Sequence, residues 1–262
     1  MSERYTHGHH GSVVAYHARR SAEDSAAFIL DHLDDSMRLL DFGCGPGSVS
    51  IDLADRVDSV VGIDAAEEAI AAARARAGDR KDVSFHVGSV YELPFEDDTF
   101  DAAFAHQVLQ HLADPGAALA EVRRVVRPGG LIGARDADYG TMVHDPHGER
   151  IDRWAKLYDA VARRNGGEPN AGRKLAGWFA AAGLQELRVT TSTWTYHEEE
   201  AVERWADLWI SRLTEARLGE LAIEYGLADR GTLEDLAGGW RAWASMPNPF
   251  FAFLHGEVIG RV

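Results

Sequence analysis

The chain has 262 residues, and its 42 acidic side chains outnumber 27 basic ones, which gives a formal charge of -15 at pH 7. This length suits one elaborated α/β domain, and a composition of 45% hydrophobic and 26% charged residues is that of a globular protein. The acidity argues against nucleic acid as a partner, because affinity for a phosphate backbone depends on lysine and arginine.

Membrane insertion and export are also disfavoured by the sequence. No apolar run approaches the roughly 20 residues of a membrane helix, and the first residues lack the basic and then apolar order of an export signal. The single cysteine, Cys44, can form no internal disulfide and favours a reducing compartment. We therefore expect a cytoplasmic protein with no membrane partner and no metal site.

The first half of the chain alternates strand-like and helix-like segments. Short apolar runs predict strands at residues 38–42, 59–64, 83–87, 100–106 and 131–136. Helical periodicity predicts helices at residues 13–33, 49–56, 65–77 and 115–126, the last of them closed by the RPGG at 127–130. Such alternation is typical of βαβ units around a parallel sheet, and the first helix is placed to close over a ligand.

The second half has a different composition. All seven tryptophans fall between Trp154 and Trp243, mostly in segments with a helical pattern. Strands are predicted at residues 184–196 and 250–262, with helices between them. We expect this half to build a pocket, and its tryptophans suit either the wall of that pocket or the core between helices. The tryptophans considered for the wall are Trp154, Trp178, Trp205 and Trp209.

A glycine-rich turn follows the first predicted strand. In LLDFGCGPGS, residues 39–48, Gly43, Gly45 and Gly47 allow backbone amides to approach a ligand closely. This predicts a nucleotide-like cofactor. The dinucleotide fingerprint has its third glycine where Ser48 stands, which counts against NAD. Cys44 lies within this turn, where a small side chain suffices for packing and a nucleophile would need a nearby base.

Asp64 ends the second predicted strand. A carboxylate at that strand tip can accept hydrogen bonds from both hydroxyls of a ribose, because the turn and the neighbouring strand end line one crevice. The alternative is that Asp64 caps the helix that follows.

These segments together resemble the class I S-adenosylmethionine-dependent methyltransferases. The resemblance runs over residues 16–138 and rests on DFGCGPG, Asp64, GSVYELPFEDDTFD and RPGG, with HQVLQHL at 106–112. It is greatest to the type 11 and ubiquinone-biosynthesis-like branch, which acts on small molecules. The resemblance implies an α/β, Rossmann-like fold: a seven-stranded, mostly parallel sheet with helices on both faces and helical insertions in the C-terminal half.

The resemblance also implies a division of one domain, 1–262. Residues 1–36 would form an N-terminal helical cap, 37–140 the cofactor-binding core, and 141–262 the substrate-side helices with the last two strands.

The cofactor implied by the resemblance is S-adenosyl-L-methionine. Asp41 and the glycine turn would lie at its methionine part, Asp64 at its ribose, and Ser89 with Val90 at its adenine, although many relatives carry aspartate at the position of Ser89. Arg20 from the N-terminal segment could pair with its carboxylate. The full predicted set is Tyr16, Arg20, Asp41, Gly43, Cys44, Gly45, Gly47, Asp64, Ala65, Gly88, Ser89, Val90, His106 and Gln107.

Methyl transfer is an in-line displacement, and it needs a base only when the nucleophile arrives protonated. Candidate catalytic residues follow the fourth and fifth predicted strands, because open parallel sheets bind ligands at the carboxyl ends of their strands. They are His111, Asp136, Asp138 and Tyr139. The alternatives are packing against the sheet for His111, and capping of the next segment for the two aspartates.

Two rival functions stay open at this stage. One is an NAD-linked oxidoreductase on a related sheet, and the other is a cofactor-binding module without catalysis. The acceptor atom and the oligomeric state also stay open, a homodimer among them. His7, His9 and His10 form a cluster without a carboxylate, so no metal is predicted there.

Overall fold

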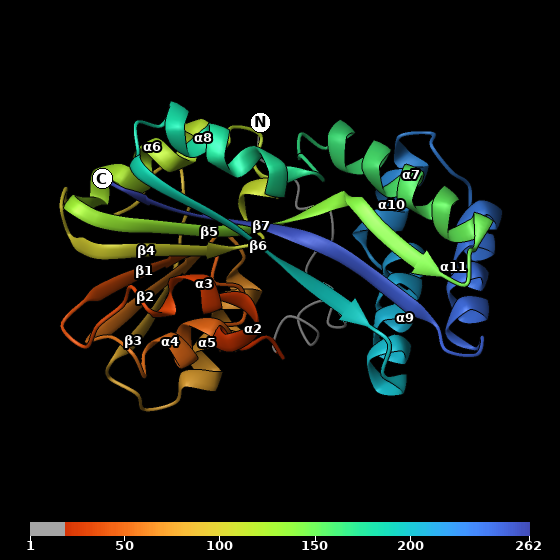
Figure 1. Cartoon of the computed structure of the whole chain (residues 1–262), viewed down its shortest axis with the longest axis horizontal. Helices are drawn as coiled ribbons and strands as arrows, with labels where there is room; N and C mark the ends of the chain where they lie inside the picture. The colour runs from red at the N-terminus through yellow and green to blue at the C-terminus, as the bar shows by residue number, and fades with distance from the viewer. Residues whose placement is uncertain (1–18) are drawn as a thin grey trace.

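The computed structural model describes residues 19–262. They fold around one seven-stranded sheet with the order β3-β2-β1-β4-β5-β7-β6 (Figure 1). The strands are β1 (Arg38–Phe42), β2 (Ser59–Asp64), β3 (Val83–Val87), β4 (Phe100–His106), β5 (Val126–Asp145), β6 (Gln185–Tyr196) and β7 (Phe250–Arg261). The first five pair in parallel, and β7 runs antiparallel between β5 and β6. The predicted α/β, Rossmann-like class is confirmed.

Helices cover both faces of this sheet. One face carries α2 (Ala22–Ser25), α3 (Ala27–Leu30), α4 (Ser48–Leu53) and α5 (Glu67–Ala77), and the other carries α6 (Pro115–Val125) and α8 (Leu175–Ala181) (Figure 1). A 3-10 turn, η1 (Leu109–His111), follows β4, and a second one, η2 (Ala171–Lys174), precedes α8. No helix among the described residues has the length and apolar content needed to cross a bilayer.

The strands β5, β6 and β7 extend beyond the rest of the sheet. On this extension lie α7 (Glu149–Arg164), α9 (Glu199–Thr214), α10 (Arg217–Glu224) and α11 (Arg230–Ala244), which we call the helical lobe (Figure 1). β5 shifts register against β7 between Asp138 and Val143, at the point where it leaves the sheet for the lobe. The helical lobe is therefore joined to the rest of the fold through three strands of the same sheet.

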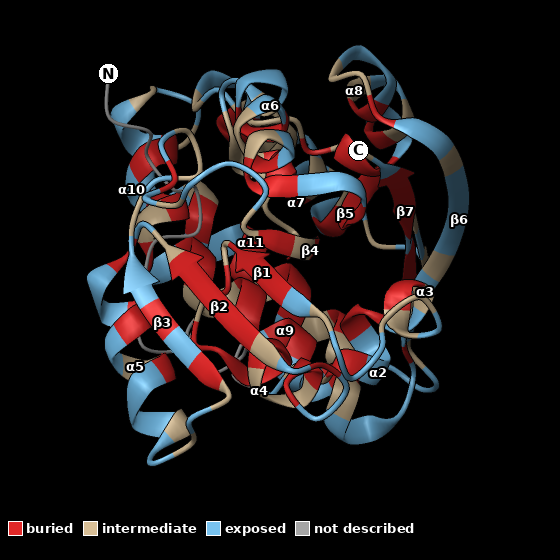
Figure 2. Ribbon diagram, turned by 90° about the vertical axis from the view of Figure 1, so that its left-hand side faces the viewer, coloured by how far each residue is buried: buried red, intermediate tan, exposed pale blue. Residues whose placement is uncertain are grey.

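Side chains that alternate along each inner strand feed two cores. Leu39 packs into the core beneath α4 and α5, whereas its neighbour Leu40 packs into the core beneath α6 and α8. β1 and β2 are almost entirely buried, and the edge strand β6 is largely exposed (Figure 2). The carboxyl ends of β1, β2 and β4 are thereby held rigidly at one rim of the sheet.

The helical lobe has an aromatic core. Trp154 lies with its ring centroid 4.3 Å from that of Trp209 and 4.8 Å from that of Trp240, both in edge-on contacts. Tyr196 stacks on Trp205 at 4.2 Å. These four tryptophans are at most 1% exposed, so the core alternative is confirmed for Trp154, Trp205 and Trp209.

The structure corrects two predicted elements. The described part of the helix expected over residues 13–33 is two short helices, because the chain leaves helical geometry at Ala26, where φ is -129°. The break lets Ile29 pack on Gly133, where a Cβ atom would lie 2.5 Å from its Cδ1. Residues 127–130, expected to close a helix, belong to β5, because Val126 already pairs with Phe100.

Candidate functional site

A cavity of about 350 Å³ opens at the carboxyl ends of β1, β2 and β4. All described residues of the predicted cofactor set line it, with the exception of Gly47. Tyr16 lies outside the described residues. Sequence reasoning did not name several apolar residues of the wall, although Pro46, Val108 and Leu112 stand within the quoted motifs. These residues are Pro46, Val49, Ile63, Ala66, Ala69, Phe104, Val108 and Leu112.

The glycine turn is held in a backbone conformation that other residues rarely adopt. Gly43 has φ +76°, and a Cβ atom there would lie 2.3 Å from Cγ2 of Val108. Gly45, which lines the cavity, has φ +53°, and no atom lies within 4 Å of its Cβ position. Gly43 is thus required for packing, whereas Gly45 leaves room for a ligand against the backbone.

Asp64 ties this turn to the end of β2. Its Oδ2 accepts a hydrogen bond from the amide of Gly45, and its Oδ1 accepts one from the amide of Ala66, each at 2.9 Å. A carboxylate oxygen has a second acceptor site, so both oxygens can still accept from ligand hydroxyls. Asp64 makes no capping bond to the first turn of α5, whose N-cap is Ala66.

Asp41 lies beneath the turn and is only 2% exposed. The hydroxyl of Ser50 donates to its Oδ2 at 2.5 Å. Burial raises the pKa of Asp41 to about 7, with a smaller contribution from the charge of Asp64. Burial also raises the pKa of the Cys44 thiol well above its usual range, which agrees with a packing role.

Gln107, directly after β4, links three distant parts of the chain. The φ of Gln107 is +57°, and its backbone N–H donates to the backbone carbonyl of Arg135 at 2.7 Å. Nη2 of Arg20 donates to its Oε1 at 2.6 Å, which turns its Nε2 toward Nε2 of His255 at 2.8 Å. His255 must therefore accept through Nε2, and burial followed by the charges of Arg135 and Arg20 lowers its pKa.

A buried ion pair lies beside this link. Nε of Arg135 donates to Glu257 at 3.3 Å and to Ser192 at 3.0 Å, and its Cζ lies 5.0 Å from the ring centroid of Trp194. Burial lowers the pKa of Arg135 to about 10 despite Glu257. No motif in the sequence indicated a role for Glu257, His255 or Trp194. The signal available was a charged or polar residue inside an apolar strand.

Of the four candidate catalytic residues, His111 lines the cavity. The carbonyl oxygen of the Gln110 side chain accepts from the amide of Ala137 at 3.3 Å, so its Nε2 is the donor to Nε2 of His111 at 3.0 Å. Burial and then the charges of Arg212 and Arg20 lower the pKa of His111 to about 3. At neutral pH this imidazole is uncharged and a weak base.

The other three candidates do not line the cavity. Asp136 is fully buried, with its Oδ1 accepting from the amide of Gln110 at 3.1 Å, and burial raises its pKa to about 7. Asp138 forms a two-pronged ion pair with Arg173, with both contacts at 2.6 Å. Tyr139 belongs to the aromatic core of the lobe, with its ring centroid 4.6 Å from that of Tyr158.

Comparison with known proteins shows where this arrangement recurs. Residues 40–133 match a family described as "Methyltransferase domain". An uncharacterized methyltransferase of Schizosaccharomyces pombe is 32% identical over 97% of this chain and 95% of its own length. The 27-O-demethylrifamycin SV methyltransferase of Amycolatopsis mediterranei is 30% identical over 72% of this chain and 70% of its own.

Among solved structures, the fold is similar to that of phosphoethanolamine N-methyltransferase 2 of Haemonchus contortus. That structure holds phosphomonomethylethanolamine and S-adenosylhomocysteine. The TM-score is 0.54 at 18% identity, and the match covers 90% of this chain and 52% of the other. The likeness is therefore one of fold.

Proposed function

Since the chain belongs to the class I S-adenosylmethionine-dependent methyltransferases, we propose that it transfers the methyl group of S-adenosylmethionine to a small organic molecule. The observation that carries the proposal is the cavity in which the glycine turn and the Asp64 carboxylate meet. The relative named for methylation of demethylrifamycin SV supports an organic metabolite as acceptor. In this proposal residues 37–140 hold the cofactor, and the acceptor is covered by residues 1–36 and 141–262.

The residues present fit the cofactor. Gly45 leaves open space where a side chain would enter, and Asp64 keeps acceptor sites for ribose hydroxyls. The Asp64 carboxylate, with Asp41 beside it, supplies acceptors at this end of the cavity, which suits a ligand with a sulfonium and an amino group. When bound, the cofactor supplies a methyl group on positively charged sulfur, and its transfer is an in-line displacement.

The chain's own residues would hold and orient the reactants. Arg20 can pair with the carboxylate of the methionine part, and Gln107 keeps Arg20 in place through the 2.6 Å hydrogen bond. His111 and Leu112 continue the cavity wall past the part proposed for the cofactor, and there an acceptor would sit and water would be excluded.

The single free cysteine and the acidic charge support a cytoplasmic protein without a nucleic-acid partner.

Calorimetry with S-adenosylmethionine and S-adenosylhomocysteine tests the proposal. We expect both to bind the native chain, and Asp64→Ala to weaken binding at least about tenfold, as the loss of charge-assisted hydrogen bonds requires. Asp79→Ala, which changes an exposed carboxylate after α5, is the matched control and should leave the affinity unchanged. Equal binding by the native chain and Asp64→Ala would remove the ribose role of Asp64.

The two rivals give different results in the same setting. An oxidoreductase binds NADH, whereas we expect no heat of binding with NADH. A binding module binds S-adenosylmethionine but transfers nothing, so a metabolite panel with methyl-labelled cofactor separates it from an enzyme. Persistent failure of transfer with tight cofactor binding would favour the module.

A further inference from the structure

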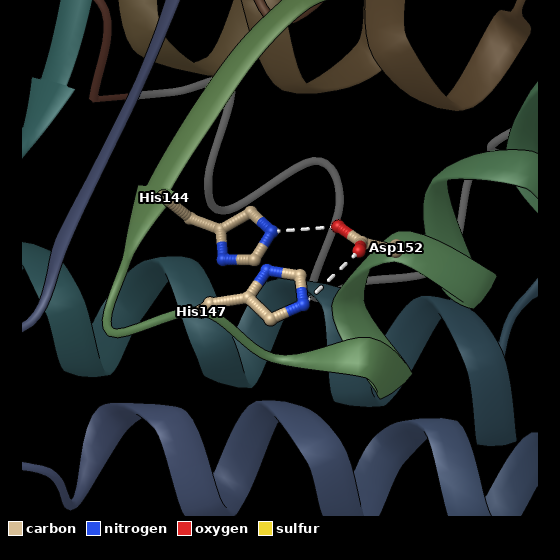
Figure 3. A group of neighbouring side chains, drawn as sticks. All are labelled: His144, His147 and Asp152. Carbon is tan, nitrogen blue, oxygen red and sulfur yellow. Dashed lines mark hydrogen bonds and ion pairs between the residues drawn. The ribbon is translucent and has the colours of Figure 1, made fainter.

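A cluster of metal-ligating side chains lies in the helical lobe, where β5 ends and α7 begins. His144 near the end of β5, His147 in the following loop and Asp152 in the first turn of α7 point toward one another (Figure 3). The ligand atoms of the three residues all lie within 4.8 Å of one another. None of the three lines the cavity proposed for the cofactor, so the proposed methyl transfer makes no use of them.

Asp152 lies between the two histidines and faces each with a different oxygen. Nε2 of His144 is hydrogen-bonded to Oδ1 of Asp152 at 2.8 Å, and Nε2 of His147 lies 3.7 Å from Oδ2. Because a carboxylate only accepts, Nε2 of His144 is the donor in this bond. The two imidazoles therefore present the same ring nitrogen to one carboxylate.

His144 is held in place, whereas His147 is accessible from solvent. The side chain of His144 is 10% exposed, and its ring is stacked between that of Phe251, with centroids 6.5 Å apart, and that of His147, at 5.6 Å. The side chain of His147 is 74% exposed. An ion that approached from solvent would therefore find one fixed imidazole and would have to order only the other.

A change of tautomer would free Nε2 of His144 for a metal ion. Nδ1 of His144 lies 3.4 Å from the carbonyl oxygen of Pro146, so the ring proton can move to Nδ1 and be donated there. For a neutral ring this exchanges the hydrogen bond to Asp152 for a metal bond without net loss of a proton. The ion would then lie between the imidazole and the carboxylate that this hydrogen bond now joins.

The charges around the cluster favour a cation. Arg150 and Arg153 on α7 both pair with Asp235 of α11, at 3.6 Å and 2.8 Å, which offsets their charges. Lys156 is exposed, so water solvates its ammonium. The chain as a whole carries a formal charge of -15, which attracts cations to its surface.

The ligand set is typical of zinc. Two imidazoles and one carboxylate, with water in the fourth position, suit Zn²⁺, whereas Mg²⁺ and Ca²⁺ prefer oxygen ligands throughout. A tetrahedral ion with bonds of about 2.0–2.2 Å separates its ligand atoms by about 3.3–3.6 Å. The 3.7 Å between His147 and Asp152 is close to this spacing, and the hydrogen bond of His144 would have to open by less than about 1 Å.

We infer that His144, His147 and Asp152 bind Zn²⁺, with water as the fourth ligand. A second cavity, of about 470 Å³, is lined by His144 and Asp152 and leaves room for that water. The ion would join the end of β5 to the first turn of α7.

This site differs from the sequence prediction of no metal. That prediction rested on the single cysteine and on a histidine cluster that lies outside the described residues, at positions 7, 9 and 10. The spacing of His144, His147 and Asp152 matches no repeat of a single helix or strand, because a loop brings the three together.

Calorimetric titration of the metal-free full chain with Zn²⁺ tests the site. We expect one ion to bind at this site, and Asp152→Asn and His147→Ala each to weaken its binding at least about tenfold. Asp152→Asn keeps the shape of the side chain and an acceptor for His144, and His147 is largely exposed, so both variants should fold. Mg²⁺ at the same concentration should not compete for the site.

Two variants control for charge and for exposed histidines. Glu149→Gln removes a negative charge from the same turn of α7, and His197→Ala removes an exposed histidine that contacts the Pro249 carbonyl. Both should bind Zn²⁺ with native affinity.

A chain with His7→Ala, His9→Ala and His10→Ala together should also retain the ion. Native affinity in Asp152→Asn, or no binding of Zn²⁺ to the native chain, would overturn the inference. So would loss of the ion from the triple variant, which would assign it to the N-terminal histidines.

Thermal unfolding gives a second readout. An ion that binds only the folded chain stabilises it by mass action, so saturating Zn²⁺ should raise the unfolding midpoint of the native chain and leave that of Asp152→Asn unchanged. Equal rises in both proteins, or no rise in the native chain, would contradict the site. Neither measurement uses S-adenosylmethionine, so the outcome is independent of the proposed methyl transfer.

Discussion

The proposed cofactor half, residues 37–140, and the helical lobe are built in opposite ways on one sheet. In the cofactor half, hydrogen bonds from backbone amides and three glycines shape the cavity, and the glycine turn and Asp64 that meet there are close in the sequence, with Gly45 19 positions from Asp64. In the lobe, large aromatic side chains from α7, α9, α11 and β7 shape the core. The cofactor half is therefore recognisable from a motif, whereas the lobe can change its residues as long as volume is kept.

Trp154→Ala should have the largest effect, because it removes the side chain at the centre of the lobe core. We expect a loss of about 3–5 kcal/mol in the free energy of unfolding, as for other buried aromatic side chains. Denaturant unfolding followed by tryptophan fluorescence measures it. If the two regions are separable, affinity for S-adenosylhomocysteine stays near native. A parallel loss of that affinity would show that they fold as one unit.

Gly43→Ala should destabilise the cofactor half, by somewhat less than Trp154→Ala destabilises the lobe. An alanine at position 43 would have to adopt a left-handed backbone conformation, and its methyl group would lie too close to Val108. Together these should lower the free energy of unfolding by about 2–4 kcal/mol. Unfolding in urea gives this number. The double variant Gly43→Ala with Val108→Ala should recover part of the loss. Failure to recover any would mean that backbone strain alone is responsible.

Asp136 lies where the two regions meet, and it should make stability depend on pH. Burial raises its pKa to about 7 in the folded chain, so the folded state holds a proton that the unfolded state has lost. Stability should therefore fall as pH rises from about 4 to about 7, by on the order of 1–3 kcal/mol. Asp136→Asn should flatten this fall in part, since Asp41 contributes the same sign. An unchanged pH profile of unfolding would contradict the assignment.

Gly45→Ala should have the smallest effect on stability and a clear effect on binding. Its Cβ position is open, so only the backbone conformation opposes the change, at about 1 kcal/mol. The added methyl group would occupy space proposed for the cofactor, and calorimetry should show affinity at least about tenfold weaker. Native affinity in this variant would place the ligand elsewhere in the cavity. Together, Gly43→Ala and Gly45→Ala separate the effect of this turn on stability from its effect on cofactor affinity.

Prediction from sequence worked where neighbours in the chain decide the structure. The limits of β1, β2, β3 and β4 were predicted residue for residue, because short apolar runs between turn residues determine them locally. Asp64 and the glycine turn were identified for the same reason, and the structure brings them together at one cavity.

What sequence reasoning missed depends on contacts between distant segments. His255 meets Gln107 across 148 positions, and Glu257 pairs with Arg135 across 122. The length of β5 follows from its pairing with β7 beyond Asp138, which periodicity within β5 does not report. Asp138 and Tyr139 follow the fifth predicted strand as expected of catalytic residues, yet one is held by Arg173 and the other by aromatic neighbours.

The position of β7 between β5 and β6 has a consequence for how the chain matures. β6 precedes β7 in the sequence, yet within residues 19–262 its only partner in the sheet is β7. Until β7 has been synthesised, the edge of β5 that will pair with it has unpaired backbone amides and carbonyls, and β6 has no strand to pair with. Nascent chains halted before Phe250 should therefore be prone to wrong strand pairing and good clients for chaperones that shield such edges.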